Sequence, residues 1–371
     1  MPDGRSGNCN GRTQGGSNAE ILIADGYVKD LKGIDYHLAL KAMLKDATVP
    51  PGGNEEKEGR GGLADYNTLG YVSNRFVRAG TRTVEYAYDD YCLAEVAKGL
   101  DKMEEYRHFI KQSENWQNLW RNVEDHGAHG FIMPKDPSGG WVDSIRCNAV
   151  DRRYHYILYT PLAQDWPNCV CWWCGFLYEG SSWEYSFFVP QDVPKLIKKC
   201  GGTELFRSRL DTFFKNGYYD VGNEPSFLTP CLYHWVGRPD LSSERVHEII
   251  NNNFSSERDG IPGNDDSGAM SSWLAFHMMG FYPNAGQPYY LITTPYFKQA
   301  IIHLDDGKEF KIITKDLSEK NVFIKSATLN GKSFNQAWIE HKDIVTGGKL
   351  ILEMSSKYTG WGSKTVPPTI K

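Results

Sequence analysis

Two long helical patterns that follow each other almost without a gap constrain the fold of this chain most. Apolar residues recur at helical spacing from Val84 to Leu100, and again from Lys102 to about Arg121. Two helices joined by so short a connection must lie antiparallel, because the chain has no room to turn in another way. The segment therefore predicts an αα-hairpin, which we interpret as the repeated unit of the fold.

Further helical patterns surround this hairpin and indicate the fold class. They cover residues 19–31, Tyr36 to about Lys45, 193–200, 204–215, 225–236, 242–254 and 268–279. Several αα-hairpins with irregular loops are typical of a mainly α chain built as an α/α toroid, in which inner and outer helices alternate. In such a toroid the loops at one end line a central cleft, so polar residues in those loops are candidates for a site.

The hydrophobic period changes from helical to strand-like at Pro288. Strand patterns begin at Tyr290, Ala300, Phe310, Val322 and Lys349, and hairpin turns are expected at Asp305–Gly307 and Asn330–Gly331. We therefore predict a helical domain over residues 1–286 and a small C-terminal antiparallel β module over residues 287–371.

Composition excludes two classes of partner and leaves one open. The net charge of −5 provides no basic surface for nucleic acid, and no apolar run approaches the ~20 residues of a membrane span. Residues 1–7 lack the apolar core of a signal peptide. The 11 Trp and 21 Tyr suit a sugar-binding cleft, although a large aromatic core has the same composition. Cys171 and Cys174 have no second pair nearby, so we interpret them as buried residues rather than a zinc site.

An acidic turn is the most conspicuous polar segment. A tight Gly- and Pro-rich turn over residues 259–263 is followed by Asn264, Asp265 and Asp266, and an apolar helical run then ends at Gly280. We expect either Asp266 or the next residue, a serine, to be the N-cap of that helix. Carboxylates gathered at a helix start either bind a cation or carry out acid–base chemistry. The alternative is a loop with an ordinary N-cap.

Two other segments carry candidate site residues. Glu179 follows an aromatic run, and a carboxyl in poorly hydrated surroundings is disfavoured in its charged form, which suits a general acid. The alternative is a rim residue in a salt bridge. Asn223 and Glu224 open another helical pattern and offer oxygens that suit Ca²⁺, although they could also be a helix cap. Separated carboxylates, an oxygen-rich turn and aromatic residues together are typical of glycoside hydrolysis.

Several longer stretches carry a family resemblance and lie in order along the chain. They are Gln14–Asn18, Ala24–Lys29, Glu85–Asp90, Phe188–Asp192, Gly222–Phe227, Tyr233 with Gly237–Asp240, Pro262–Trp273 and Met279–Pro283. Together they resemble glycoside hydrolase family 92, the calcium-dependent, inverting exo-α-mannosidases. The resemblance implies an (α/α)6-barrel catalytic domain that follows an N-terminal β-sandwich.

The resemblance also implies catalytic roles. Glu179 corresponds to the general acid of the family, in a Glu-Gly-x-x-Trp segment whose Trp183 is expected to bind substrate. Asp266 corresponds to the general base, assisted by the residue two positions earlier, which is Asn264 here and Asp in some members.

Calcium and substrate ligands follow from the same resemblance. Asn223 and Glu224 fall where the family holds Ca²⁺, which is expected to bind O2 and O3 of mannose. Asp265 is expected to contact substrate. Members selective for α-1,2 bonds carry a His-Glu pair near this loop, and Tyr219 and Asp220 lie in that neighbourhood here.

The expected function is removal of terminal, most favourably α-1,2-linked, mannose from N-glycans or mannans. The chain starts inside the catalytic domain of the family, so we expect a barrel that is incomplete at its N-terminus. The alternative is therefore a truncated, non-catalytic relative that at most binds carbohydrate or calcium. Hydrolysis of mannose-1-phospho-6-mannose is less favoured, because that leaving group needs no strong acid and Glu179 is present. The family resemblance implies an extracellular or secretory location.

Overall fold

The computed structural model describes residues 16–53, 59–148, 154–162, 175–263 and 265–369. The chain forms two compact units, one of residues 1–191 with 211–219 and one of residues 192–210 with 220–371. The domain boundary predicted after residue 286 lies inside the second unit and stays a prediction. Within the described ranges, no helix is long and apolar enough to cross a membrane.

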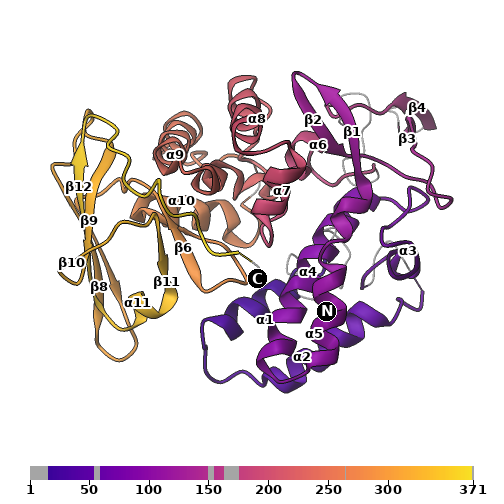
Figure 1. Cartoon of the computed structure of the whole chain (residues 1–371), viewed down its shortest axis with the longest axis horizontal. Coiled ribbons are helices and arrows are strands. Elements are labelled where there is room, and N and C mark those ends of the chain that lie inside the picture. The colour runs from indigo at the N-terminus through magenta and orange to yellow at the C-terminus, as the bar shows by residue number, and fades with distance from the viewer. Residues whose placement is uncertain (1–15, 54–58, 149–153, 163–174, 264, 370–371) are drawn as a thin grey trace. The chain divides into compact units, whose positions relative to one another are not determined.

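The first unit is organised around α4 (Ala79–Gly99), which is buried on nearly all of its faces. The helices α1 (Ala19–Val28), α2 (Tyr36–Thr48) and α5 (Met103–Gln112) pack against it (Figure 1). The predicted αα-hairpin is confirmed, since α4 and α5 are joined by only a short turn and lie in contact. A short helix, α3 (Leu63–Leu69), completes this helical group.

The interior of this helical group contains charged side chains in addition to apolar ones. The Arg60 guanidinium donates to Asp90, 2.6 Å away on α4, and to Glu20 on α1. All three side chains are fully buried, so the ion pairs compensate the cost of removing their charges from water. The polar network therefore fixes how α1 and the Arg60 loop pack against α4.

Both helices of the hairpin differ in extent from the prediction. The first begins five residues earlier, at Ala79 rather than Val84, because distant backbone satisfies its first amide groups: Gly80 N–H donates to the carbonyl of Phe176 at 2.9 Å. The second ends early at Gln112. A 3₁₀ turn, η1 (Asn115–Leu119), follows, and Trp120 then starts a strand.

Short strands fill the region that the sequence predicts as loop and short strand. β1 (Trp120–Asp125) pairs antiparallel with β2 (Ala128–Ile132), and β3 (Ser144–Asn148) pairs antiparallel with β4 (Tyr154–Leu158). The short helix α6 (Ser182–Tyr185) packs against β2. Of these elements, α6 bonds the segment that carries Glu179, through the Tyr185 hydroxyl.

The second unit begins with helices. They are α7 (Val193–Lys199), α8 (Thr203–Lys215, whose last turn belongs to the first unit), α9 (Pro239–Asn253) and α10 (Ala269–Met279). The helix predicted over 225–236 is instead two 3₁₀ segments, η2 (Glu224–Ser226) and η3 (Thr229–Val236). Each segment has a proline in its first turn, Pro225 and Pro230, which lacks the amide hydrogen that a continuous helix needs.

The C-terminal β module contains two sheets (Figure 1). Their apolar residues share one core. The smaller sheet has the order β11 (Trp338–Glu340), β6 (Tyr289–Ile292) and β5 (Phe281–Pro283), so β5 lies before the predicted start of the module at residue 287. The larger has the order β10 (Lys332–Ser333), β9 (Phe323–Leu329), β12 (Gly348–Ser355), β8 (Glu309–Lys315) and β7 (Gln299–His303). A short helix, α11 (His341–Val345), precedes β12.

The antiparallel prediction for this module holds for every described pairing but one. β12 lies parallel to β8, with Leu350 opposite Ile312, because it inserts between β8 and β9 instead of extending the hairpin. Apolar residues of both sheets and of α10, such as Leu352, Ile292 and Phe276, form one core. The helix that follows the acidic turn is thereby anchored to the β module.

A buried histidine makes the stability of the second unit sensitive to acid. The His234 ring lies 2.9 Å from the Ser242 hydroxyl and 2.9 Å from the carbonyl oxygen of Ile292, and burial lowers its pKa to about 4. Its folded pKa lies below its unfolded value of about 6.5, so the unfolded chain binds the proton first as the pH falls. The stabilisation is complete above pH 6.5 and is lost between about pH 6.5 and 4.

We expect the free energy of unfolding to fall over this pH range by up to about 3 kcal/mol more in the wild type than in His234→Asn. Urea unfolding at pH 7, 5.5 and 4.5 measures this difference. Parallel pH profiles for the two proteins would show that His234 does not carry the effect.

Candidate active site

The segment that leads to Glu179 runs along the first turn of α4. Arg78 N–H donates to the carbonyl of Gly175 at 2.7 Å, and Tyr178 N–H donates to the Thr81 hydroxyl at 2.8 Å. A side chain at Gly80 would lie only 2.6 Å from the Phe176 ring, so glycine is what allows the two segments to approach this closely. The end of the aromatic run is therefore fixed to a buried helix.

Glu179 has a left-handed backbone conformation, with a φ of 49°, and its side chain is half-buried. This conformation is unfavourable for a residue with a Cβ atom and persists only where the surroundings enforce it. The next residues supply part of that support through a capping box, in which Ser181 and Glu184 bond each other's backbone amides. Strain that is held in place from both sides marks Glu179 as a functional candidate.

Trp183 is fully buried directly after this segment. Its ring is stacked on Phe213 with 6.2 Å between centroids, and its indole N–H donates to Asp125 at 2.7 Å. The structure thus places Trp183 among buried aromatic rings of the first unit, and its predicted contact with substrate stays a prediction. Tyr219, also in the first unit, is half-buried against Phe214, with 5.2 Å between the two ring centroids.

Two predicted site loops of the second unit meet through their backbones. The position of a Cβ atom on Gly263 would lie 2.2 Å from the carbonyl oxygen of Gly222, so only glycine fits at this contact. Gly263 also has a left-handed φ of 62°. The structure therefore brings the Asn223–Glu224 loop and the acidic turn together, although about forty residues of chain separate them.

Asp220 organises the first of these loops. Its carboxylate accepts the backbone N–H of Gly222 at 2.7 Å and the side-chain amide N–H of Asn223 at 3.1 Å. Because the Asn223 amide nitrogen faces Asp220, its carbonyl oxygen is the atom that points elsewhere. Glu224 follows as the first residue of η2 and is half-buried.

The prediction that Asp266 or Ser267 is the N-cap of α10 is wrong, and the side chain that bonds the first turn of this helix is that of Asp265. Gly268 occupies the N-cap position with a φ of 82°, and the Asp265 carboxylate accepts both the backbone N–H, at 2.8 Å, and the hydroxyl of Ser271. These hydrogen bonds lower the pKa of Asp265. Asp266 begins the preceding 3₁₀ turn, η4 (Asp266–Gly268), and is half-buried.

Some predicted residues lie outside the described part of the chain. These are Asn264 and the CxxC pair Cys171 and Cys174. Within the described ranges, no group of three or more His, Cys, Asp or Glu side chains is arranged to hold a metal ion. The candidates thus form one group around Glu179 in the first unit and another around Asp266 in the second.

Sequence reasoning singled out the polar segment Tyr178–Tyr185 but assigned no supporting role to any residue around Glu179. Thr81, Glu85 and Tyr185 are all buried and contact the Glu179 segment or each other. The sequence gives two signals: Tyr185 ends the polar segment that contains Glu179, and Glu85 lies in one of the stretches that carry the family resemblance.

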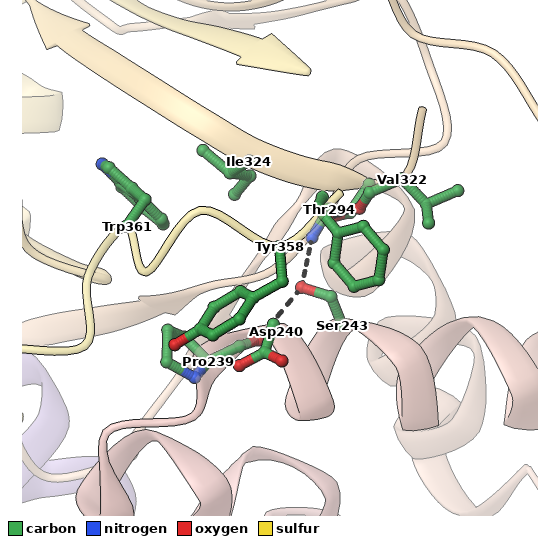
Figure 2. Close-up of a pocket in the computed structure, with 9 residues that line it drawn as sticks. Pro239, Asp240, Ser243, Thr294, Val322, Ile324, Tyr358 and Trp361 are labelled. Atoms are coloured by element: carbon green, nitrogen blue, oxygen red, sulfur yellow. Dashed lines mark hydrogen bonds between the residues drawn. The ribbon is translucent and has the colours of Figure 1, made fainter. Parts of the chain in front are cut away.

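A small pocket in the second unit is lined by residues other than the predicted site residues. Figure 2 shows this pocket. Ser243 of α9 accepts the backbone N–H of Thr294 at 3.0 Å and donates to the carbonyl of Pro239, and Tyr358 and Trp361 complete the wall. The Arg238 guanidinium lies 5.1 Å from the centre of the Tyr358 ring. These contacts attach α9 to the C-terminal β module.

Comparison with known proteins identifies the family. The sequence pattern of the glycosyl hydrolase family 92 catalytic domain matches residues 1–356. An uncharacterized secreted glycosidase of Arthroderma benhamiae is 39% identical over 100% of this chain and 49% of its own length.

Two solved structures from Bacteroides thetaiotaomicron agree with this match. A family 92 α-mannosidase in complex with mannoimidazole is 30% identical, with a TM-score of 0.82 over 96% of this chain and 46% of its own. A family 92 inverting mannosidase is 28% identical, with a TM-score of 0.82 over 95% of this chain and 48% of its own. The chain thus spans about half the length of the relatives it matches. It belongs to glycoside hydrolase family 92.

Proposed function

We propose that this chain carries the catalytic groups of a calcium-dependent, inverting exo-α-mannosidase. The observation that carries the proposal is Glu179, a half-buried carboxyl held in a strained backbone conformation by a buried helix and a capping box. Family membership and the likeness to two mannosidases support the choice of mannose as the sugar. The substrate is terminal α-linked mannose, most favourably α-1,2-linked, in N-glycans or mannans.

The mechanism needs one acid and one base on opposite sides of the sugar. Glu179 protonates the leaving oxygen, while Asp266 removes a proton from the water that attacks the anomeric carbon, with Asn264 assisting. An inverting mechanism requires the two carboxyl groups to lie roughly 6.5–9.5 Å apart, so that a water fits between them.

The architecture we propose is the (α/α)6 barrel of the family, to which α4 and α5 contribute a helical hairpin. Asp265, Tyr219, Asp220 and Trp183 are the proposed substrate contacts. By analogy with the secreted relative, we place the protein outside the cytosol.

The chemistry of the Asn223–Glu224 loop fits Ca²⁺. Asn223 offers an amide oxygen and Glu224 a carboxylate, and both are the hard oxygen donors that this ion prefers. The ion, when bound, supplies positive charge that holds sugar hydroxyls. Asp220 serves the loop by engaging the amide nitrogen of Asn223, which presents the amide oxygen on the other side.

The stereochemistry of the first product tests the proposal. An inverting enzyme acting on an α-mannoside releases β-mannose, because water attacks the face opposite to the leaving group. We expect proton NMR of the anomeric region to show β-mannose within the first minutes, before mutarotation produces the α form. Early appearance of α-mannose would contradict the roles of Glu179 and Asp266. Absence of any mannose would favour a non-catalytic relative that at most binds carbohydrate or calcium.

A further inference from the structure

A buried tyrosine, Tyr185 of α6, holds the backbone immediately before Glu179. Its hydroxyl oxygen lies 2.9 Å from the carbonyl oxygen of Tyr178 and 3.3 Å from Oε1 of Glu85 on α4. The Thr81 hydroxyl also bonds Tyr185 and accepts the backbone N–H of Tyr178 at 2.8 Å. The peptide groups of Tyr178 are thus held on both sides by buried side chains, one residue before the strained Glu179.

Counting the protons available to these groups shows whether Glu85 must be protonated to bond Tyr185. A phenol has a single proton to donate, and carbonyl and carboxylate oxygens can only accept. If Tyr185 donates to the nearer acceptor, the Tyr178 carbonyl, then its contact with Glu85 is a hydrogen bond only when Glu85 supplies the proton. An ionised Glu85 would compete for the Tyr185 proton and weaken the hold on Tyr178.

We propose that Glu85 is a positioning residue that acts as a neutral carboxylic acid: it donates to Tyr185, which in turn holds Tyr178 and so aims Glu179. This inference rests on the proposed role of Glu179 as general acid. Glu85 has no contact with the reacting atoms in this scheme, and its effect passes through Tyr185.

The surroundings of Glu85 favour its neutral form. The side chain is only 8% exposed. Burial, reinforced by the charge of Asp89 one turn along α4, raises the pKa of Glu85 to about 8. The backbone N–H of Gly16, the Tyr185 hydroxyl and the Arg78 charge act in the opposite direction but are weaker.

Neighbouring carboxylates also affect the pKa of Tyr185. Glu179 and Glu184 both lie close enough to raise the pKa of the Tyr185 phenol, which burial raises most. Tyr185 therefore stays protonated throughout the range in which Glu85 titrates, and Glu85 is the member of the pair that can lose its proton.

Two variants of Glu85 separate positioning from simple loss of packing. In Glu85→Leu the donor is missing, and we expect kcat on an α-1,2-dimannoside to fall about 10²-fold because the acid is misplaced, with KM changed little. In Glu85→Gln the amide N–H donates to Tyr185, so kcat should stay within about threefold of the wild type. Tyr185→Phe should behave like Glu85→Leu. Glu95→Gln, on the same helix and half-buried, is the matched control and should behave like the wild type.

A change of leaving group gives the readout that a merely structural role would not produce. Dinitrophenyl α-mannoside needs no acid assistance, so the kcat of Glu85→Leu on this substrate should be close to that of the wild type. A loss of kcat that is equal on both substrates would overturn the proposal, because a general disturbance of the site does not distinguish leaving groups. A Glu85→Gln variant as poor as Glu85→Leu would also overturn it, because the proposal requires only a donor.

The protonation of Glu85 can be measured without activity. The infrared band of a protonated carboxyl should appear in wild type minus Glu85→Gln difference spectra at pH 6 and disappear by pH 10. A missing band at pH 6 would overturn this inference and leave the proposed mannosidase activity intact. Conversely, wild type that shows the band but releases no mannose from either substrate would contradict the proposed function.

Discussion

Glu179→Gln is expected to lower kcat on an α-1,2-dimannoside by about 10²–10⁴-fold, which is the usual contribution of general acid catalysis. Glutamine matches the shape of the glutamate but cannot protonate the leaving oxygen. Activity on dinitrophenyl α-mannoside should fall much less, because that leaving group departs without a proton. Initial rates on the two substrates, at matched protein concentration, measure the difference. An unchanged rate on the dimannoside would remove Glu179 from the mechanism.

A companion variant, Glu179→Gly, uses the backbone strain as an independent readout. The φ of 49° costs a residue with a Cβ atom about 1–2 kcal/mol, and glycine avoids this cost. We expect Glu179→Gly to be at least as stable to urea as the wild type while it loses activity on the dimannoside. A stable but inactive Glu179→Gly protein would show that the Glu179 side chain serves catalysis and not folding. A large loss of stability would instead show that the side chain serves the fold.

The local parts of the fold could be predicted from the sequence, and the parts set by distant contacts could not. The αα-hairpin follows from apolar spacing and a short connection, and Gly280 ends α10 in the left-handed conformation expected of a C-cap glycine. The start of α4 depends on hydrogen bonds from a segment almost a hundred residues away, which no local pattern reveals. The parallel pairing of β12 with β8 likewise depends on where β12 inserts.

The candidate site shows the same division between local and distant causes. Glu179, Asp266 and the Asn223–Glu224 loop could be identified from the sequence, because carboxylate and amide side chains stand there in turns next to helical or aromatic segments and match stretches of the family. Capping by Asp265 could not be foreseen, since it depends on left-handed conformations at Ser267 and Gly268 that turn the chain back toward Ser271. The role of Glu85 was hidden for another reason: a buried acid inside a helix looks like an ordinary ion pair until its partner is known to be a tyrosine hydroxyl.

EDTA is expected to abolish mannose release while the melting temperature barely changes. The oxygen donors Asn223 and Glu224 lie on one short loop, which is anchored by groups other than an ion: Asp220 bonds its backbone, and the Trp273 indole N–H donates to the carbonyl of Phe227 at 3.0 Å. A loop held in this way does not need a cation to fold. Few protein ligands would leave coordination positions for sugar hydroxyls, so the ion should matter for turnover rather than for stability.

Added Ca²⁺ should restore activity after EDTA, whereas Mg²⁺ should do so poorly, because it is smaller and sheds water reluctantly. Glu224→Ala should reproduce the effect of EDTA, and Ca²⁺ binding measured by calorimetry should weaken in parallel. Glu257→Ala removes an exposed carboxylate from the neighbouring turn and is the matched control, with calcium response and rate like the wild type. Full activity in EDTA, or a Glu224→Ala variant with unchanged kinetics, would contradict the calcium role. In that case the loop would be only the start of η2, and the binding energy for the sugar hydroxyls would have to come from side chains such as Asp220 alone.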